Sequence, residues 1–370
     1  MEKGWIKKTF DDCIDKVKVK TKLPSSAYCK DGKYPIISQE KELISGYWDC
    51  ADDVISTAHP VTIFGDHTMV AKYINFDFVV GADGVKILQP KTFLNPRFFY
   101  YWVCSVNIPS RGYARHYRYL RERNVEYPSS LDEQKRIVEI LDKEFEKIDT
   151  LKANAEKGLQ YAKKLFQSAL KQELLPKEGW MIKSLDMIST FSQGVQVEVG
   201  KQFTEKLDGY MRFLRIVDFT QGNEPPRYVD IIDERYQVKK DSLSVVRYGA
   251  SAGFICTGQE GVIANNIFKI ELKRDTLISN AYLYYVLISD IFQSVIRENV
   301  NGAAMPAISF GMIKDVNIPY PSIQEQNQIV AHLDKLKAHC NNLQKNYEKT
   351  IALCDNMKQT LLRKAFNGEL

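Results

Sequence analysis

Two long stretches of the chain carry apolar side chains at every third or fourth position, with polar and charged residues between them. This spacing puts the apolar side chains on one face of an α-helix. The first stretch begins at Ser130 and contains one glycine, Gly158, while the second runs from Ser322 to Asn367 without proline or glycine. At 1.5 Å per residue, about 44 residues form a rod of roughly 65 Å. The pattern therefore predicts two long helices.

The two helical stretches are copies of one another. From Glu133 onward the offset is constant at 192 residues, as shown by Gln134 with Gln326, Ile137 with Ile329, and Leu141 with Leu333. Each copy opens with a capping box, Ser130-x-x-Glu133 and Ser322-x-x-Glu325, whose side chains can satisfy free amides of the first helical turn. Shorter phrases upstream also recur, such as Val85-Lys86-Ile87 with Phe268-Lys269-Ile270. Such repetition predicts two related units.

Each rod has a narrow apolar stripe and needs a partner to be stable in water. Two rods of matched length and pattern in one chain favour an intramolecular antiparallel coiled coil. The alternative is that the rods act separately, as dimer contacts or as spacers between domains. The predicted organisation is a globular part at 1–127, a helix at 128–175, a second globular part at 176–320 and a second helix at 321–370.

The globular parts show short β-prone runs and turns, among them Pro60–Asp66, Phe76–Leu88 with a turn at Asp83-Gly84, and Arg212–Asp218. A helical, aromatic patch follows in each part, at Asn95–Val103 and Asn280–Leu287, and we expect it to be core. The predicted fold class is α/β (α+β): two small mixed α/β domains separated by two long antiparallel helices that form an intramolecular coiled coil.

Composition narrows the class of protein. The 370 residues are 44% apolar and 26% charged, which is typical of a folded protein. We find neither an apolar run long enough for a membrane span nor a signal peptide. The seven cysteines are odd in number and include no Cys-x-x-Cys pair, so we expect reduced thiols in a cytoplasmic protein and no bound metal. The net charge of +5 only leans toward a polyanionic partner.

The positive excess lies mainly in the first globular part, with a net charge of +4 against −1 in the second. Within it, Ser110–Arg123 holds five arginines, three tyrosines, one histidine and one acid. Arginine can bind phosphate or the guanine edge, and tyrosine can donate to phosphate, so this stretch suits a DNA surface. The equally weighted alternative is a solvated helix whose arginines pair with acids. The candidate DNA contacts here are Arg111, Tyr113, Arg115, His116 and Arg118.

In the second globular part, the amides of Asn265 and Asn266 could bind adenine edges, although an adjacent asparagine pair is more often a turn. The loop that begins at Asn301 occupies the position of the basic stretch, so the two parts would contact different bases. The remaining candidate DNA contacts are Lys72 and Lys86 in the first part and Arg212, Arg215, Arg247, Ser251, Asn301 and Ser309 in the second.

Motifs for catalysis are missing. The sequence has no nucleotide-binding glycine loop, no Asn-Pro-Pro-Tyr or Asp-Pro-Pro-Tyr of amino-methyltransferases, no Gly-x-Ser-x-Gly and no His-Glu-x-x-His. Glu271-Leu-Lys273 only faintly suggests a nuclease cluster. We therefore expect no catalytic residues, no metal ligands and no cofactor on this chain.

The duplicated Glu133-Gln134 and Glu325-Gln326, each followed by Ile-Val-x-x-Leu-Asp, resemble the specificity (S, HsdS) subunits of Type I restriction-modification systems. Phe64-Gly-Asp-His-Thr68, Gly81–Leu88 and Tyr113-Ala-Arg-His116 also resemble recognition-domain sequences of that family. The resemblance spans the whole chain. It departs in that the chain is somewhat short and its second domain lacks the basic tract.

This resemblance implies a non-catalytic DNA-binding subunit with two target-recognition domains, each for one half of a bipartite, asymmetric double-stranded target, and helices that set the spacing. It implies two modification (methyltransferase) subunits docked on the helices, together with restriction subunits, in DNA methylation and phage defence. S-adenosylmethionine, ATP and Mg²⁺ are expected on those partners. The alternatives are the specificity subunit of a Type IIB enzyme, a coiled-coil scaffold that binds no DNA, and a stand-alone nuclease.

Overall fold

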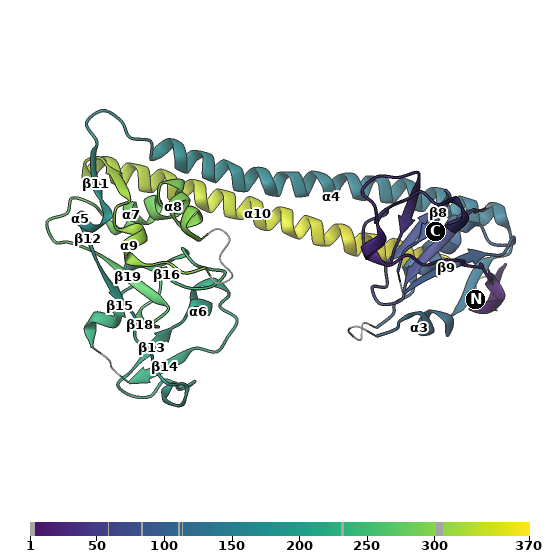
Figure 1. The fold of residues 1–370 in the computed structure, drawn as a ribbon, viewed down its shortest axis with the longest axis horizontal. Helices are drawn as coiled ribbons and strands as arrows, with labels where there is room; N and C mark the ends of the chain where they lie inside the picture. The colour runs from purple at the N-terminus through teal and green to yellow at the C-terminus, as the bar shows by residue number, and fades with distance from the viewer. Residues whose placement is uncertain are drawn as a thin grey trace. The chain divides into compact units, whose positions relative to one another are not determined.

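The computed structural model describes residues 4–57, 59–82, 84–109, 112, 114–230, 233–300 and 306–370. The chain forms two compact units, and each contains parts of both long helices (Figure 1). The first unit comprises residues 1–157 and 347–370, and the second comprises residues 158–346.

The described residues in the globular part of the first unit form three β-sheets. Strands β1 and β10 form a two-stranded sheet, and the two four-stranded sheets have the orders β2-β9-β6-β7 and β4-β3-β8-β5. The elements are β1 (Trp5–Thr9), α1 (Phe10–Cys13), β2 (Ile14–Asp15), β3 (Tyr34–Ile37), β4 (Gly46–Trp48), β5 (Val54–Ile55), β6 (Val61–Gly65), β7 (Ala71–Ile74), β8 (Phe78–Val80), β9 (Val85–Pro90), α2 (Pro96–Ser105), α3 (Tyr117–Arg121) and β10 (Asn124–Pro128).

The second unit repeats this topology. Its sheets are β11-β20, β12-β19-β16-β17 and β14-β13-β18-β15, and the parallel pair β13·β18 corresponds to β3·β8. The elements are β11 (Met181–Ser184), α5 (Leu185–Ile188), β12 (Ser189–Gln193), β13 (Tyr210–Leu214), α6 (Ile216–Thr220), β14 (Arg227–Asp230), β15 (Gln237–Val238), β16 (Leu243–Val246), β17 (Ile255–Cys256), β18 (Gly261–Ile263), β19 (Ile267–Leu272), α7 (Asn280–Ile288), α8 (Asp290–Val300), α9 (Phe310–Ile313) and β20 (Asn317–Tyr320). The structure therefore shows the duplication strand by strand.

The long helices are α4 (Leu131–Glu173) and α10 (Ile323–Phe366). Within the first unit they run antiparallel, because Asp149 of α4 pairs with Lys358 of α10 at 2.5 Å, while Lys152, further along α4, pairs with Asp355, which lies earlier in α10. Within the second unit, Glu173 near the end of α4 contacts His332 near the start of α10 at 2.9 Å. The predicted intramolecular antiparallel pair and the predicted fold class are confirmed.

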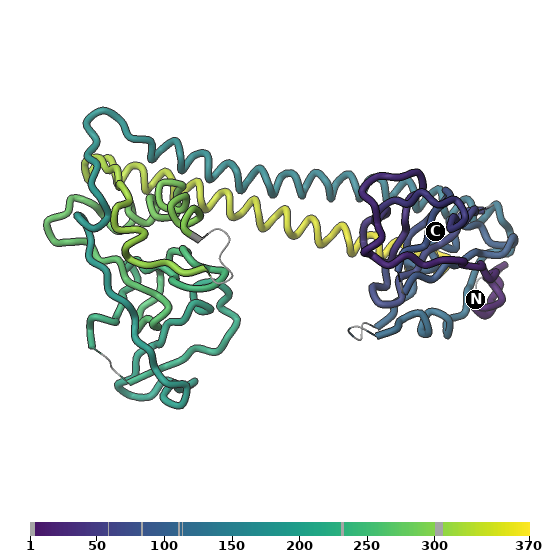
Figure 2. The backbone as a smooth tube through the Cα atoms, in the orientation of Figure 1, coloured from purple at the N-terminus to yellow at the C-terminus, as the bar shows by residue number. Residues whose placement is uncertain are grey.

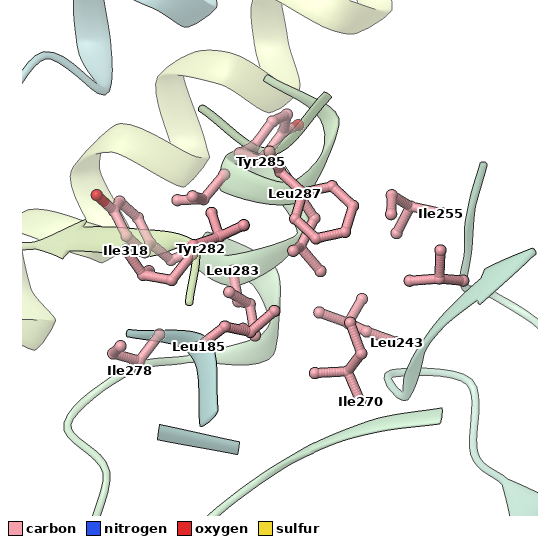
Figure 3. Packing of buried hydrophobic residues seen from close by; sticks show 14 of the residues in the cluster. Leu185, Leu243, Ile255, Ile270, Ile278, Tyr282, Leu283, Tyr285, Leu287 and Ile318 are labelled. Carbon is pink, nitrogen blue, oxygen red and sulfur yellow. The ribbon is translucent and has the colours of Figure 1, made fainter. Parts of the chain in front are cut away.

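Each globular part packs on the helices through one apolar core. In the first unit, Phe98 and Phe99 of α2 pack with Leu141 of α4 and with Leu362 of α10. The C-terminal end of the chain lies in this unit (Figure 2). In the second unit, side chains of α7 such as Tyr282 and Leu283 gather with Leu243 and Ile270 of the sheet (Figure 3). Helices α2 and α7 match the predicted aromatic patches, which are core as expected.

Two local expectations are corrected. Arg212–Asp218 is not one strand, because β13 ends at Leu214 and the Asp218 carboxylate then caps α6. The capping boxes form only in part: the hydroxyls accept from Glu133 N and Glu325 N, but the glutamate carboxylates bind Arg136 and Trp180 instead. The turn predicted at Asp83-Gly84 agrees with the structure at Gly84, and it connects β8 and β9, which belong to different sheets.

Candidate nucleic-acid interface

In each unit, one buried glutamine attaches the globular part to the start of its long helix. Gln134 and Gln326 are both 0% exposed. The Gln134 Oε1 accepts the N–H of Asn95 at 2.7 Å, and its Nε2 donates to two backbone carbonyls, of Phe93 and Pro128. Gln326 repeats all three bonds, with Ser279 N–H at 3.0 Å and with the carbonyls of Leu277 and Pro321. The amide oxygen and nitrogen of both buried glutamine side chains are thereby paired.

A tyrosine–aspartate hydrogen bond reinforces each attachment about two turns further along the helix. Tyr101 donates to Asp142 of α4, and Tyr285 donates to Asp334 of α10. The two aspartates are again 192 residues apart in the chain. Burial raises the pKa of both tyrosines, so they remain protonated donors at neutral pH. A cation lies on each tyrosine cluster, but it comes from α2 in the first unit (Arg97) and from α10 in the second (Lys337).

The basic stretch of the first domain is partly exposed. Arg115 and Arg118 are exposed, and the Arg118 guanidinium lies 4.5 Å from the ring centroid of Tyr119. Arg121 pairs with Asp11 at 2.5 Å, as the alternative of arginines bound to acids would have it. Arg111 and Tyr113 lie outside the described residues. Arg115 and Arg118 are therefore candidates that are exposed, and the same holds for the position of Arg123 at the end of this stretch.

Three other candidates of the first domain have structural roles. His116 is 0% exposed and its ring contacts the Asp66 carbonyl at 3.1 Å, which leaves no surface for a DNA contact. Lys72 is 5% exposed, and its ammonium donates to the carbonyls of Ser38 and Glu42; its pKa is lowered because burial penalises the charged form. Lys86 is half-buried and lies 3.6 Å from the Asp66 carboxylate.

Gln39 packs against two of the segments that resemble recognition-domain sequences, Phe64–Thr68 and Gly81–Leu88. Its Oε1 accepts the N–H of His67 at 3.2 Å, and its carbonyl accepts the Thr68 hydroxyl at 2.6 Å. A Cβ at Gly65 would lie 2.2 Å from the Thr68 Oγ1, and a Cβ at Gly84, where φ is +95°, would lie 2.6 Å from the Gln39 Oε1. Both positions therefore require glycine. Sequence reasoning missed Gln39, and Gly65 and Gly84 were the signal that could have pointed to this packing.

In the second domain, most candidate side chains are engaged within the protein. Arg212 and Arg215 both pair with Asp218, at 2.9 and 3.1 Å, and Arg215 also pairs with Glu224. These two candidate arginines are therefore neutralised locally, because their ion pairs with the buried Asp218 carboxylate hold both guanidinium groups on their own domain.

The remaining candidates of that domain lie at turns. Asn265 and Asn266 form the turn between β18 and β19, and the Asn265 amide donates to Gln196 at 3.0 Å. Arg247 donates from Nε to the carbonyl of Ile308 at 3.2 Å. Ser309 is exposed at the start of α9, Ser251 is half-buried, and Asn301 lies outside the described residues.

The described part of the chain contains no group of three or more histidine, cysteine or acidic side chains that could hold a metal ion. Glu271, of the faint nuclease pattern, pairs with Lys269 at 3.3 Å. Among the described residues, no helix is long and apolar enough to span a membrane.

The chain thus belongs to the class of proteins with two copies of one small domain, each attached to the start of a long helix. Residues 2–160 and 177–353 match the family model of the Type I restriction modification DNA specificity domain, and the chain belongs to that family. The predicted resemblance is therefore confirmed, as is the prediction of a Type I specificity subunit, and the Type IIB and scaffold alternatives are not favoured.

Individual relatives agree with the family. The chain is 24% identical over 369 residues to the Type I restriction enzyme EcoBI specificity subunit of Escherichia coli, covering 89% of this chain and 76% of that protein. Its fold is similar to a chain in a structure of a type I R-M system, with a TM-score of 0.74 at 14% identity over 99% and 98% of the two chains. The HsdS subunit from Thermoanaerobacter tengcongensis gives a TM-score of 0.53 at 16% identity over 100% and 98%.

Proposed function

We propose that this chain is the DNA-reading subunit of a Type I restriction-modification complex and that each globular domain binds one half of a bipartite, asymmetric target in double-stranded DNA. The observation that carries the proposal is duplication with divergence. Both domains have the same strand order, yet their net charges are +4 and −1 and their exposed turns differ. Domains of one fold with different surface side chains would contact different bases.

The long helices would set the spacing between the two half-sites and dock the modification subunits. Large apolar side chains remain exposed at equivalent positions of the two helices: Tyr161 and Leu165 in α4, and Leu353 and Met357 in α10. Each pair is separated by one helical turn, and the two pairs are 192 residues apart. Two equivalent apolar surfaces support docking of two copies of one partner.

Catalysis would lie entirely on the partner subunits. S-adenosylmethionine would bind to the modification subunits, and ATP and Mg²⁺ to the restriction subunits. The lack of catalytic motifs in the sequence supports this division of roles. We propose that the complex acts in the cytoplasm.

Single-molecule sequencing of methylated adenines in the host genome tests the proposal. The expected result is one asymmetric motif with two defined parts and a fixed gap, and its methylation disappears when the gene for this chain is deleted. A methylation pattern unchanged by the deletion would exclude the proposed function. Symmetric methylated sites would exclude two domains with different preferences.

A further inference from the structure

Asp66 in the first domain and Arg247 in the second occupy the same backbone position, but their side chains have opposite charges. Asp66 directly follows β6, and Arg247 directly follows β16. The Asp66 N–H donates to the carbonyl of Gly84 just before β9 at 2.7 Å, and the Arg247 N–H donates to that of Asn266 just before β19 at 2.8 Å. The two positions are therefore structurally equivalent.

The same two residues hold the segment that precedes the last strand of each domain. The Asp66 carbonyl accepts the N–H of His116 at 2.8 Å, and the Arg247 carbonyl accepts the N–H of Ile308 at 2.9 Å. His116 and Ile308 are 192 residues apart, and both are buried. His116 lies within the basic stretch of the first domain, and Ile308 lies in the loop from Asn301 of the second, the two segments for which the sequence predicts DNA contact.

In the first domain the Asp66 side chain continues this attachment. Its Oδ1 accepts the N–H of Tyr117, the first residue of α3, at 2.8 Å, and its Oδ2 lies 3.6 Å from the Lys86 ammonium. Asp66 is only 4% exposed, so it does not reach DNA itself. It fixes the backbone from which the exposed Arg115 and Arg118 project.

In the second domain the Arg247 side chain plays the corresponding part with different chemistry. Its Nε donates to the Ile308 carbonyl at 3.2 Å, and its guanidinium lies 4.9 Å from the ring centroid of Tyr248. The attachment thus uses a donor where the first domain uses an acceptor. Because the partners differ, the segment carried by one domain would not be held correctly by the other.

We infer that Asp66 and Arg247 are positioning residues, each of which sets the DNA-reading segment of its own domain and thereby the base preference at one half-site. This inference rests on the proposed function and deepens it. It predicts that the two residues act independently, one on each half of the target.

The test measures binding of the full chain, in complex with its modification subunits, to three duplexes: the target identified by adenine methylation, and the same target with either half-site scrambled. For Asp66→Ala, discrimination at one half-site is expected to fall by about tenfold or more and to stay within about twofold at the other. Arg247→Ala is expected to show the mirror image. Each variant serves as the matched control for the other.

Asp66→Asn separates positioning from general damage, since its side-chain oxygen can still accept the Tyr117 N–H. It is expected to recover most of the lost discrimination, with binding to unrelated DNA unchanged. If Asp66→Ala fails to fold, Asp66→Glu, which displaces the carboxylate, replaces it with the same expected loss.

The inference is overturned if both half-sites weaken together, if neither changes, or if the two variants affect the same half-site. If the wild-type complex itself discriminates neither half-site, the proposed function fails instead.

Discussion

Gln134 and Gln326 show how a single polar side chain can specify a junction between domain and helix. Each makes three hydrogen bonds to backbone atoms of the chain that precedes its helix, in an environment closed to water. A hydrophobic contact would tolerate small rotations of the domain, whereas three directional bonds do not. The invariant pattern in both repeats therefore reflects orientation of the domain as much as stability.

Replacing Gln326 with alanine is expected to destabilise the second unit by about 3 kcal/mol, because it leaves three buried backbone groups without a partner. The measurement is the denaturant midpoint of unfolding. Gln328→Ala, two residues further along the same helix and exposed, is the matched control and should change the midpoint little. Equal effects of the two substitutions would show that the buried bonds do not matter.

Arg115 and Arg118 are the described candidates that remain exposed in the first domain. If each neutralises one phosphate, replacing either with alanine lowers the magnitude of the slope of log K against log salt concentration by about 0.9. The measurement is DNA binding over a range of salt concentrations. Arg136→Ala is the control, because Arg136 is already paired with Glu133 at 2.7 Å. An unchanged slope for both variants would remove these arginines from the interface.

At the scale of the element, the long helices combine two tasks that require different faces. One face of each helix packs in the core, where Leu141 and Leu333 are fully buried at equivalent positions. Other faces carry ion pairs between the helices, such as Lys152 with Asp355, and isolated exposed apolar side chains. Exposed ion pairs contribute only about 0–1 kcal/mol each, so the apolar stripe provides most of the stability of the pair.

Shortening both helices by one turn tests whether they set the target spacing. Four residues are deleted from α4 around Lys152 and four from α10 around Asp355, which face each other, so that the paired stripe stays nearly in register. A loss of about 6 Å corresponds to one or two base pairs at ~3.4 Å each. Adenine methylation mapping should show the shorter gap.

Replacing the same eight residues with alanine, without changing the length, is the control and should leave the gap as it was. A folded deletion variant that still methylates sites with the original gap would contradict a spacing role for the helices.

At the scale of the whole molecule, one topology appears twice with different side chains at equivalent places. The buried positions that mount the domain, such as Gln134 and Gln326, are kept, while Asp66 and Arg247 differ in charge. Conserving the mount and varying the exposed segments lets one architecture serve two different half-sites. A repeat of this kind also provides two equivalent positions for a duplicated partner.

DNA binding by the purified chain is expected to be independent of divalent metal ions. The described residues form no metal-ligand cluster, and DNA contact through arginine needs no bridging ion. Binding measured by fluorescence anisotropy at constant ionic strength should be the same with EDTA as with Mg²⁺. A chelator that abolishes binding would indicate a metal site on this chain and would contradict the assignment of Mg²⁺ to the partner subunits.

The sequence alone determined the two-unit plan and the two long helices. Both are written in local periodicity and in a 192-residue offset, which survive without knowledge of any distant contact. The aromatic helices α2 and α7 were predictable for the same reason, since their caps and apolar faces lie within about ten residues.

Only the tertiary structure decided which candidate side chains face solvent. The sequence predicts His116 and Lys72 as surface DNA contacts, but both side chains are buried. Each hydrogen-bonds to backbone carbonyls of segments 30 to 50 residues away. Likewise, the positioning role proposed for Asp66 depends on the meeting of β6, β9 and α3 in the folded domain. Burial and polarity of a single position depend on neighbours that the chain brings from elsewhere, and no local pattern contains them.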